Sequence, residues 1–289
     1  MVQEFILGVG ILAGLGLFFA AIIALAYKKL RVYEDPRIDE VEAMLPHANC
    51  GACGQPGCRA FAEALVSGAA IPSKCSVSSK EGVEKIAAYL GVDAGSEEKR
   101  VARLLCAGGK KEAHNLADYR GGLHTCRGEA VVTGGIKSCT WGCLGLGDCV
   151  SVCAFDALYM NDDGLPTVIA EKCTACGDCV RICPKGLFEI MPVSQKLVVQ
   201  CKSLLEGDLA TSKCSVACTA CGRCVADSLP GVIEIKNNLA VVNYALNDLT
   251  AENAVCRCPT GAIKWIDFQQ FEGVKESKLP VGRVERYDG

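Results

Sequence analysis

The sequence predicts an α+β chain in which a single N-terminal transmembrane helix precedes several small cysteine-rich modules. The first observation behind this is a run of 22 uncharged residues, Phe5 to Ala26, near the N-terminus. The second is the presence of 21 Cys among 289 residues, most of them in tight groups. The third is a content of 31 Gly, which together with the grouped cysteines favours small loop-rich modules over one large core.

The overall composition excludes two broad classes of protein. Half of the residues are hydrophobic, so the chain is too apolar to be disordered. The 30 Lys and Arg against 33 Asp and Glu give a formal net charge of −3, so we expect no nucleic-acid partner. A secreted disulfide scaffold stays open on composition alone, and the cysteine spacing must decide it.

The apolar run is long enough to cross a bilayer. As a helix, 22 residues reach about 33 Å, against a hydrocarbon core of roughly 30 Å. Lys28, Lys29 and Arg31 follow it, so we expect a single pass with residues 27–289 on the cytoplasmic side. The alternative, a cleaved signal peptide, needs a basic leader that the sequence MVQE lacks.

The first cysteine group lies among predicted helices. We expect a helix from near Pro36 to before Pro46, a second in RAFAEALVSG and a third around Lys80–Leu90. Four cysteines in a Gly/Pro-rich frame suit a four-iron cluster, although their spacing alone leaves zinc open. We interpret His47 as a polar residue near a helix end rather than as a ligand. The four predicted ligands are Cys50, Cys53, Cys58 and Cys75.

The strongest motif is Cys173-x2-Cys176-x2-Cys179-x3-Cys183-Pro184. In two-cluster ferredoxins, the first three thiolates of such a run bind one cubane and the fourth binds the other. Zinc sites use two tight pairs instead, and a reducing cytoplasm disfavours disulfides. The motif therefore predicts iron–sulfur modules, including ferredoxin-like (two-cluster βαβ-repeat) domains.

A partner half lies 30 residues upstream, because Cys149 and Cys153 precede Cys179 and Cys183 by that offset. Between the halves, Asn161–Gly164 is flanked by ALYM and PTVI, which predicts a hairpin. Crossed ligation then assigns two clusters. One is expected on Cys139, Cys143, Cys149 and Cys183, and the other on Cys173, Cys176, Cys179 and Cys153.

A degenerate copy of the motif follows. The first three cysteines of the strong motif recur 45 residues later in the sequence. Further downstream, Cys258-Pro259 matches the final Cys-Pro of a second half of the repeat. The other four ligand positions hold Ser228, Asp248, Ala251 and Ala254. Under crossed ligation those four would have served one cluster, so we predict that only the other remains. Its ligands are Cys218, Cys221, Cys224 and Cys258.

Five cysteines remain outside these groups. Two of them, Cys106 and Cys201, each end an apolar strand-like run. Two interpretations stay open: an additional cluster, or free thiols that pack as small hydrophobic side chains. Cys256 has no assigned role. The additional cluster would use Cys106, Cys126, Cys201 and Cys214.

The expected domain organisation follows these groups. The expected boundaries are 1–31 for the anchor, 32–95 for a four-cysteine [4Fe–4S] domain, 96–138 for a connector, 139–192 for a two-cluster ferredoxin-like domain, 193–264 for a degenerate ferredoxin-like domain with one cluster, and 265–289 for a tail. No phosphate-binding loop and no G-x-G-x-x-G motif occurs, so we expect no nucleotide site. No catalytic acid, base or nucleophile is predicted.

The order of the motifs resembles a known family. The apolar anchor, YEDPR, NCGACGQPGC, GGIKSCTWGCLGLGDCVSVCAFDAL and KCTACGDCVRICP together resemble the B subunit of the Rnf complex. The resemblance implies an electron-transfer subunit of a membrane-bound, ion-translocating ferredoxin:NAD+ oxidoreductase in the bacterial inner (cytoplasmic) membrane. Such a subunit accepts electrons from soluble reduced ferredoxin and passes them to the other subunits, which carry the nicotinamide chemistry. Four [4Fe–4S] clusters are expected, or five if the additional group binds one.

Two other functions remain compatible with the same chemistry. One is a polyferredoxin arm of another membrane reductase, which differs only in its partners. The other is a membrane-tethered iron–sulfur redox sensor, which needs one labile cluster and usually an output domain. The sequence contains a series of cysteine groups and no recognisable output domain, so electron transfer is favoured.

Overall fold

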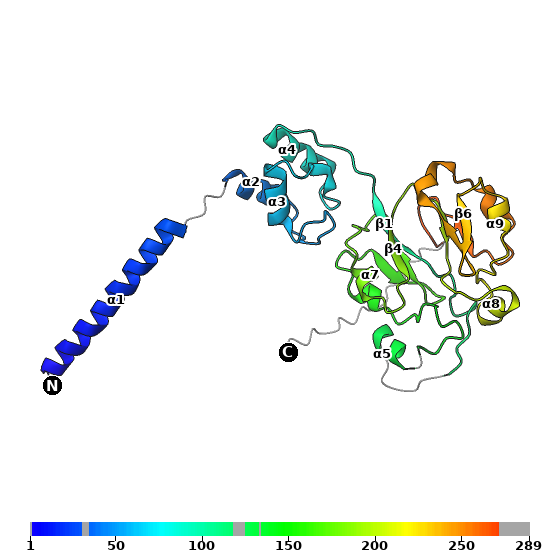
Figure 1. The fold of residues 1–289 in the computed structure, drawn as a ribbon, viewed down its shortest axis with the longest axis horizontal. Helices are drawn as coiled ribbons and strands as arrows, with labels where there is room; N and C mark the ends of the chain where they lie inside the picture. The colour runs from blue at the N-terminus through cyan, green and yellow to red at the C-terminus, as the bar shows by residue number, and fades with distance from the viewer. Residues whose placement is uncertain (1, 31–34, 118–124, 133, 272–289) are drawn as a thin grey trace.

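The computed structural model describes residues 2–30, 35–117, 125–132 and 134–271. Figure 1 shows a long N-terminal helix, a small helical domain and two lobes built from short strands and helices. The helices are α1 (Val2–Leu30), α2 (Arg37–Met44), α3 (Cys58–Val66), α4 (Lys80–Leu90), α5 (Cys126–Val131), α6 (Asp148–Ser151), α7 (Asp178–Ile182), α8 (Gly207–Lys213), α9 (Arg223–Ala226) and α10 (Asn253–Cys256), with short 3-10 turns at Pro72–Lys74 and Tyr244–Leu249. The strands are β1 (Arg100–Leu104), β2 (Leu158–Met160), β3 (Pro166–Val168), β4 (Phe188–Pro192), β5 (Leu197–Val199), β6 (Ile233–Lys236), β7 (Leu239–Val242) and β8 (Ile263–Trp265).

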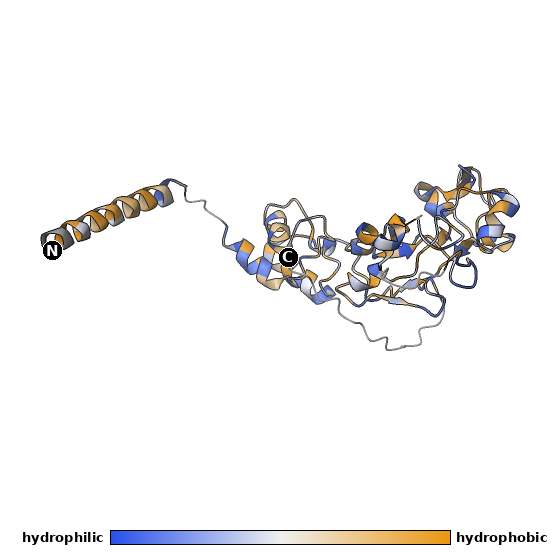
Figure 2. Ribbon diagram, turned by 90° about the horizontal axis from the view of Figure 1, so that it is seen from below, coloured by the Kyte–Doolittle hydropathy of each residue, from blue (hydrophilic) through white to orange (hydrophobic). Residues whose placement is uncertain are grey.

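Helix α1 carries the predicted apolar run. Its segment Ile6–Lys29 has a mean hydropathy of 2.6, and none of its most apolar window is buried against the rest of the chain. Figure 2 shows this helix as almost uniformly hydrophobic. It is the one helix in the described part of the chain that is long and apolar enough to cross a bilayer. Lys28 and Lys29 lie in its last turn.

The small helical domain consists of α2, α3 and α4, the three helices that the sequence predicts. Ser79 caps α4 by accepting a hydrogen bond from the Gly82 N–H at 3.1 Å, and Gly91 ends the helix with a φ of 67°. Asn49 caps α3, because its Oδ1 accepts from the Cys58 N–H at 2.7 Å. The buried core of the domain consists of Val41, Leu45, Phe61, Ala62, Leu65 and Ile86.

The two lobes share one topology. In the first lobe, β1 pairs with β4 and the β2–β3 hairpin lies between them in the chain, preceded by α6 and followed by α7. In the second lobe, β5 pairs with β8 and the β6–β7 hairpin lies between them, preceded by α9 and followed by α10. All four pairings are antiparallel. The predicted hairpin around Asn161–Gly164 is the β2–β3 hairpin.

Left-handed backbone positions recur in the cysteine loops. Gly147, Gly177 and Gly222 each precede a short helix with φ values of 82°, 83° and 71°. Ala175 and Ala220, 45 residues apart, also have positive φ values of 60° and 57°. A positive φ costs an alanine free energy, so both loops are held by their surroundings in the same strained turn. The 45-residue sequence repeat is therefore also a backbone repeat.

Two segments that lie outside the expected domains contact the first lobe. Residues 96–138 were predicted as a connector, yet they contain β1, which pairs with β4 from Arg100↔Pro192 to Leu104↔Phe188. The predicted tail begins at residue 265, yet Gln270 both accepts from the Leu104 N–H at 3.0 Å and donates to the Leu104 carbonyl at 2.6 Å. The reason is the same in both cases: β1 needs hydrogen-bond partners on two edges, and both come from distant segments.

Candidate iron–sulfur sites

Five cavities of similar size are each lined by four cysteines, and together they use 20 of the 21 cysteines. Each encloses about 320 to 380 Å³ of empty space, part of it open to solvent. We call them site 1 (Cys50, Cys53, Cys58, Cys75), site 2 (Cys126, Cys143, Cys149, Cys183), site 3 (Cys153, Cys173, Cys176, Cys179), site 4 (Cys218, Cys221, Cys224, Cys258) and site 5 (Cys106, Cys139, Cys201, Cys214).

The structure groups the cysteines of sites 1, 3 and 4 as the spacing does, and it differs at sites 2 and 5. The sequence prediction placed Cys139 with Cys143, Cys149 and Cys183, and it placed Cys126 in the additional group. In the structure these two residues are exchanged: Cys126 lines site 2 and Cys139 lines site 5. His47 lines none of the five cavities, and Cys256 is exposed.

The exchange has a local cause at the start of α6. The Asp148 carboxylate accepts hydrogen bonds from the N–H groups of Cys126 at 2.9 Å and Arg127 at 3.2 Å. These bonds hold the first turn of α5 against α6 and place Cys126 at site 2. Thr125 caps the same turn by accepting from the Gly128 N–H at 3.1 Å. The sequence signal for this was weak, because Thr125 has Gly128 and not Glu or Gln three residues later, so the full capping-box pattern is missing.

A tight turn directs Cys139 away from site 2. The Gly142 N–H donates to the Cys139 carbonyl at 3.0 Å, and a Cβ at Gly142 would lie 3.1 Å from that oxygen. The chain therefore reverses between Cys139 and Cys143, and their side chains line different cavities. Although only three residues separate the two cysteines, their spacing alone does not decide that they share a cluster.

The cavities suit a polynuclear cluster better than a single metal ion. In the described residues, no three Cys, His, Asp or Glu side chains lie close enough together to bind one metal ion. All 21 cysteines are free thiols, so none is used in a disulfide. Four thiols spread around one cavity fit a group that is larger than an ion. A single zinc ion requires all four sulfurs at about 2.3 Å from one point.

Burial keeps the buried thiols of sites 2 to 5 neutral in the absence of a cluster. Burial raises the pKa of Cys143 and Cys179 to about 12, and that of Cys201 and Cys224 to about 11. Cys258 differs. Burial also acts to raise its pKa, but hydrogen bonds from backbone N–H groups outweigh that effect and leave the pKa below its ordinary value. Binding of a cluster as thiolates therefore has to offset a desolvation cost at the buried sites.

Backbone amides donate to several of the sulfurs. The Ala157 N–H donates to the Cys153 Sγ at 3.4 Å, and the Leu187 N–H donates to the Cys183 Sγ at 3.5 Å. Each donor lies four residues after its cysteine, so the two halves of the repeat use the same turn. These bonds stabilise a negative sulfur, which is the form that binds iron.

Two buried cations lie beside the sites. Arg103 is 1% exposed, and its Nη1 donates to the Phe268 carbonyl at 2.8 Å while its Nε and Nη2 have no partner among the described residues. Burial lowers the pKa of Arg103, whereas the neighbouring Cys173 of site 3 acts to raise it. Lys137 is 6% exposed and donates to the Gly108 carbonyl at 2.8 Å. A buried guanidinium with two unpartnered nitrogens and a buried ammonium held by one carbonyl both fit an anionic group in the adjacent cavity.

Thiol-lined cavities with amide donors and buried cations define an iron–sulfur protein with several cluster sites. Comparisons with known proteins agree with this class. A family described as putative Fe–S cluster matches residues 45–77, which include site 1, and a 4Fe–4S binding domain matches residues 165–188, which include most of site 3.

Curated relatives identify the family. The chain is 42% identical to the B subunit of the Na(+)-translocating ferredoxin:NAD(+) oxidoreductase complex of Acetobacterium woodii, covering 91% of this chain and 78% of the relative. It is 38% identical to the B subunit of the proton-translocating complex of Clostridium ljungdahlii, with 89% and 92% coverage, and 37% identical to that of the ion-translocating complex of Methanosarcina acetivorans, with 89% and 96% coverage. The chain belongs to the family of B subunits of these Rnf-type complexes.

Proposed function

We propose that this chain is the membrane-anchored electron-transfer subunit of an ion-translocating ferredoxin:NAD+ oxidoreductase. In this proposal it accepts electrons from soluble reduced ferredoxin and relays them to the membrane subunits of the complex. The family membership supports the assignment to such a complex. The observation that carries the relay is the succession of four-cysteine cavities along the folded chain.

Sites 1, 3 and 2 follow one another through direct contacts. The Ser76 hydroxyl, next to Cys75 of site 1, donates to the carbonyl of Thr174, next to Cys173 of site 3, at 2.7 Å. Sites 3 and 2 share one core in the first lobe, which contains Cys179 and Cys149. The pKa of Cys149 is raised by burial first and then by neighbouring thiols, Cys179 among them. An electron therefore has a short path between each pair of neighbouring sites.

The residues of this chain hold and tune the redox centres and carry out no proton chemistry. A bound [4Fe–4S] cluster takes up and gives back one electron, at a potential set by hydrogen bonds to sulfur, burial and nearby charge. The cysteines bind it, the amide N–H groups and Arg103 stabilise the reduced form, and the apolar core keeps water away. Nicotinamide chemistry is assigned to other subunits.

The proposed topology is a single pass through the bacterial inner membrane with the iron–sulfur part in the cytoplasm. The support is the apolar segment Ile6–Lys29 and the basic pair Lys28 and Lys29 at its end. Site 1 lies in the domain that directly follows the anchor in the sequence. We therefore propose that site 1 passes electrons on to the membrane subunits.

Substitution of a site 1 cysteine tests the relay. Cys50→Ser and Cys58→Ser, produced in the assembled complex, should block electron transfer beyond this subunit while sites 2 and 3 remain reducible by ferredoxin. The matched control is Cys256→Ser, because Cys256 is exposed and lines no cavity. Onward transfer at the control rate in both variants would contradict the proposed order. Co-purification of the chain with a different membrane reductase would instead favour the polyferredoxin-arm alternative.

A further inference from the structure

Site 5 lies between the two lobes, and each lobe supplies two of its cysteines. Cys106 follows β1 and Cys139 precedes α6, whereas Cys201 follows β5 and Cys214 follows α8. Backbone hydrogen bonds around the site join the lobes. They run from the Ala107 N–H to the Gln200 carbonyl at 3.1 Å and from the Ser215 N–H to the Glu112 carbonyl at 3.0 Å.

The space in the middle of site 5 is kept open by a glycine. A Cβ at Gly108 would lie 2.9 Å from the Cys214 Sγ and 3.8 Å from the Cys106 Sγ. Real Cβ atoms essentially never come as close as 2.9 Å to another heavy atom, so any larger residue would displace a cysteine. If the four thiols were simply packed as small hydrophobic side chains, nothing would be gained by leaving this space free.

One polar group that lines site 5 lacks a partner in the part of the chain that the structure describes, and a buried cation adjoins the site; Lys202 also lines it but pairs with Glu189 at 3.2 Å. Gln200 lines the cavity and is 4% exposed, and its Nε2 donor has no partner among the described residues. Among the described residues, the buried Lys137 ammonium donates to the Gly108 carbonyl; burial raises the pKa of Cys106, and the Lys137 charge acts against that rise. No Asp or Glu is among the described residues that line the cavity. An unpartnered donor and a buried cation both point to an anionic occupant.

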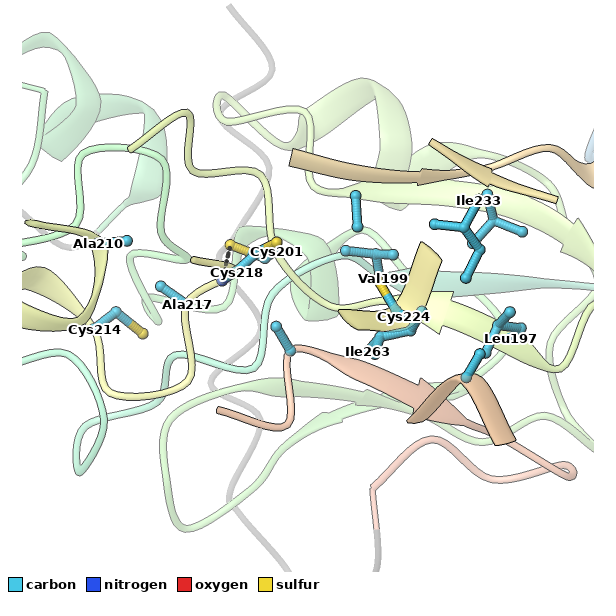
Figure 3. Packing of buried hydrophobic residues seen from close by; sticks show 14 of the residues in the cluster. Leu197, Val199, Cys201, Ala210, Cys214, Ala217, Cys218, Cys224, Ile233 and Ile263 are labelled. Atoms are coloured by element: carbon cyan, nitrogen blue, oxygen red, sulfur yellow. Dashed lines mark hydrogen bonds between the residues drawn. The ribbon is translucent and has the colours of Figure 1, made fainter. Parts of the chain in front are cut away.

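Two hydrogen bonds connect site 5 with its neighbours. The N–H of Cys143, a residue of site 2, donates to the Cys106 Sγ at 3.4 Å. The N–H of Cys218, a residue of site 4, donates to the Cys201 Sγ at 3.4 Å. Figure 3 shows the second contact, with Cys201 and Cys218 side by side and Cys214 beyond Ala217. Site 5 is thus one hydrogen bond away from a ligand residue of each adjacent site.

We propose that Cys106, Cys139, Cys201 and Cys214 bind a fifth [4Fe–4S] cluster, and that this cluster is the electronic bridge between the two lobes. The proposal rests on the proposed function, in which the other sites form an electron relay. It extends that relay to the order 1, 3, 2, 5, 4. Each transfer along it oxidises one centre by one electron and reduces its neighbour by one electron, and no bond or proton changes place. Site 5 takes the place between sites 2 and 4 because it is hydrogen-bonded to a residue of each.

Metal content provides the first test, on the full-length chain purified without oxygen. The wild type should contain about 20 Fe per chain, and Cys201→Ala and Cys214→Ala about 16. Gly108→Ala retains every ligand yet should also lose four Fe, because the added methyl group occupies the space beside Cys214. The controls are Cys256→Ala and Gly82→Ala, whose new Cβ meets nothing nearer than 3.5 Å; both should retain about 20 Fe. A wild type with about 16 Fe, or variants that retain the wild-type content, would overturn the fifth site.

Electron paramagnetic resonance of the reduced chain tests the bridge. Subtracting the Cys221→Ala spectrum from the wild-type spectrum leaves the site 4 signal with site 5 present. Subtracting the Cys201→Ala/Cys221→Ala spectrum from the Cys201→Ala spectrum leaves the site 4 signal without site 5. The site 4 signal should be broadened by the neighbouring spin when site 5 is present, and it should be narrow when site 5 is absent. Two identical difference spectra would refute the bridge even if the iron count is 20. If Cys201→Ala does not fold, Gly108→Ala replaces it in the same comparison. Failure of the proposed function would appear elsewhere, as missing transfer to partner subunits with all five sites filled.

Discussion

The attachment of α5 to α6 by Asp148 predicts that one acidic side chain controls the lability of site 2. Asp148→Ala removes the two hydrogen bonds that hold the first turn of α5, at 2.9 and 3.2 Å. One of these bonds is exposed, so we assign them together about 2 kcal/mol. Because each 1.4 kcal/mol is a factor of ten, Cys126 should leave its position about thirty-fold more often.

Iron release to a chelator, followed without oxygen, measures this effect. Four Fe per chain should leave Asp148→Ala about thirty-fold faster than they leave the wild type, while the rest leave at the wild-type rate. Asp267→Ala is the control, because the Asp267 carboxylate pairs with the Lys196 side chain at 2.9 Å and Asp267 lines none of the five cavities.

A double variant identifies the site concerned. Adding Asp148→Ala to Cys126→Ala should produce no fast phase, since the fourth ligand of site 2 is already lost. If the fast phase disappears in the Cys139→Ala background and persists in the Cys126→Ala background, the grouping by spacing is right and the grouping by structure is refuted.

Two further predictions concern the surroundings of sites 3 and 1. Arg103→Met should lower the reduction potential of site 3, because it removes a buried positive charge next to Cys173. Arg103→Lys keeps the charge and should largely preserve the potential. A redox titration followed by electron paramagnetic resonance measures both variants, and an unchanged potential in Arg103→Met would contradict the prediction. Asn49→Ala should release the site 1 iron about five-fold faster, because losing the bond to the Cys58 N–H costs about 1 kcal/mol. Unchanged chelator kinetics would show that Asn49 does not hold this loop.

The groupings at sites 1, 3 and 4 could be derived from the sequence because local turns and one repeat determine them. The offset of 30 between the two halves of the first lobe, and of 45 between the lobes, corresponds to shared backbone turns. Ala175 and Ala220 adopt the same left-handed conformation, as do Gly177 and Gly222. Where cysteines occupy equivalent turns, their spacing in the sequence determines which side of the loop each sulfur faces.

Sites 2 and 5 could not be separated by spacing, because each depends on contacts between distant segments. Cys126 reaches site 2 through the Asp148 carboxylate, 22 residues further along the chain. Site 5 needs both lobes to be folded and docked before its four sulfurs meet. A pattern of short spacings carries no information about such docking, so the nearest cysteine in the sequence need not be the nearest one in space.

The elements of the fold divide in the same way. The helices of the small domain were predictable because apolar periodicity and local caps define them, and α4 begins and ends at the expected residues, Lys80 and Leu90. The pairing of β1 with β4 could not be predicted, because the two short strands lie far apart in the sequence, with Arg100 opposite Pro192. The sequence indicates a strand-like run that ends at Cys106, but no sequence feature identifies the strand with which it pairs.

Charge explains why the cations Arg103 and Lys137 lie beside inner sites. Filling a buried site converts thiols with raised pKa values into thiolates, and an uncompensated buried negative charge is costly. At site 4, where Cys221 is exposed, water can screen that charge. Beside sites 3 and 5 a buried guanidinium and a buried ammonium supply positive charge instead, and among the described residues their hydrogen bonds go to backbone carbonyls and not to carboxylates. The same two groups would be a liability in a chain that never bound an anion at these positions, and their burial is therefore an argument for occupancy that is independent of any cysteine pattern.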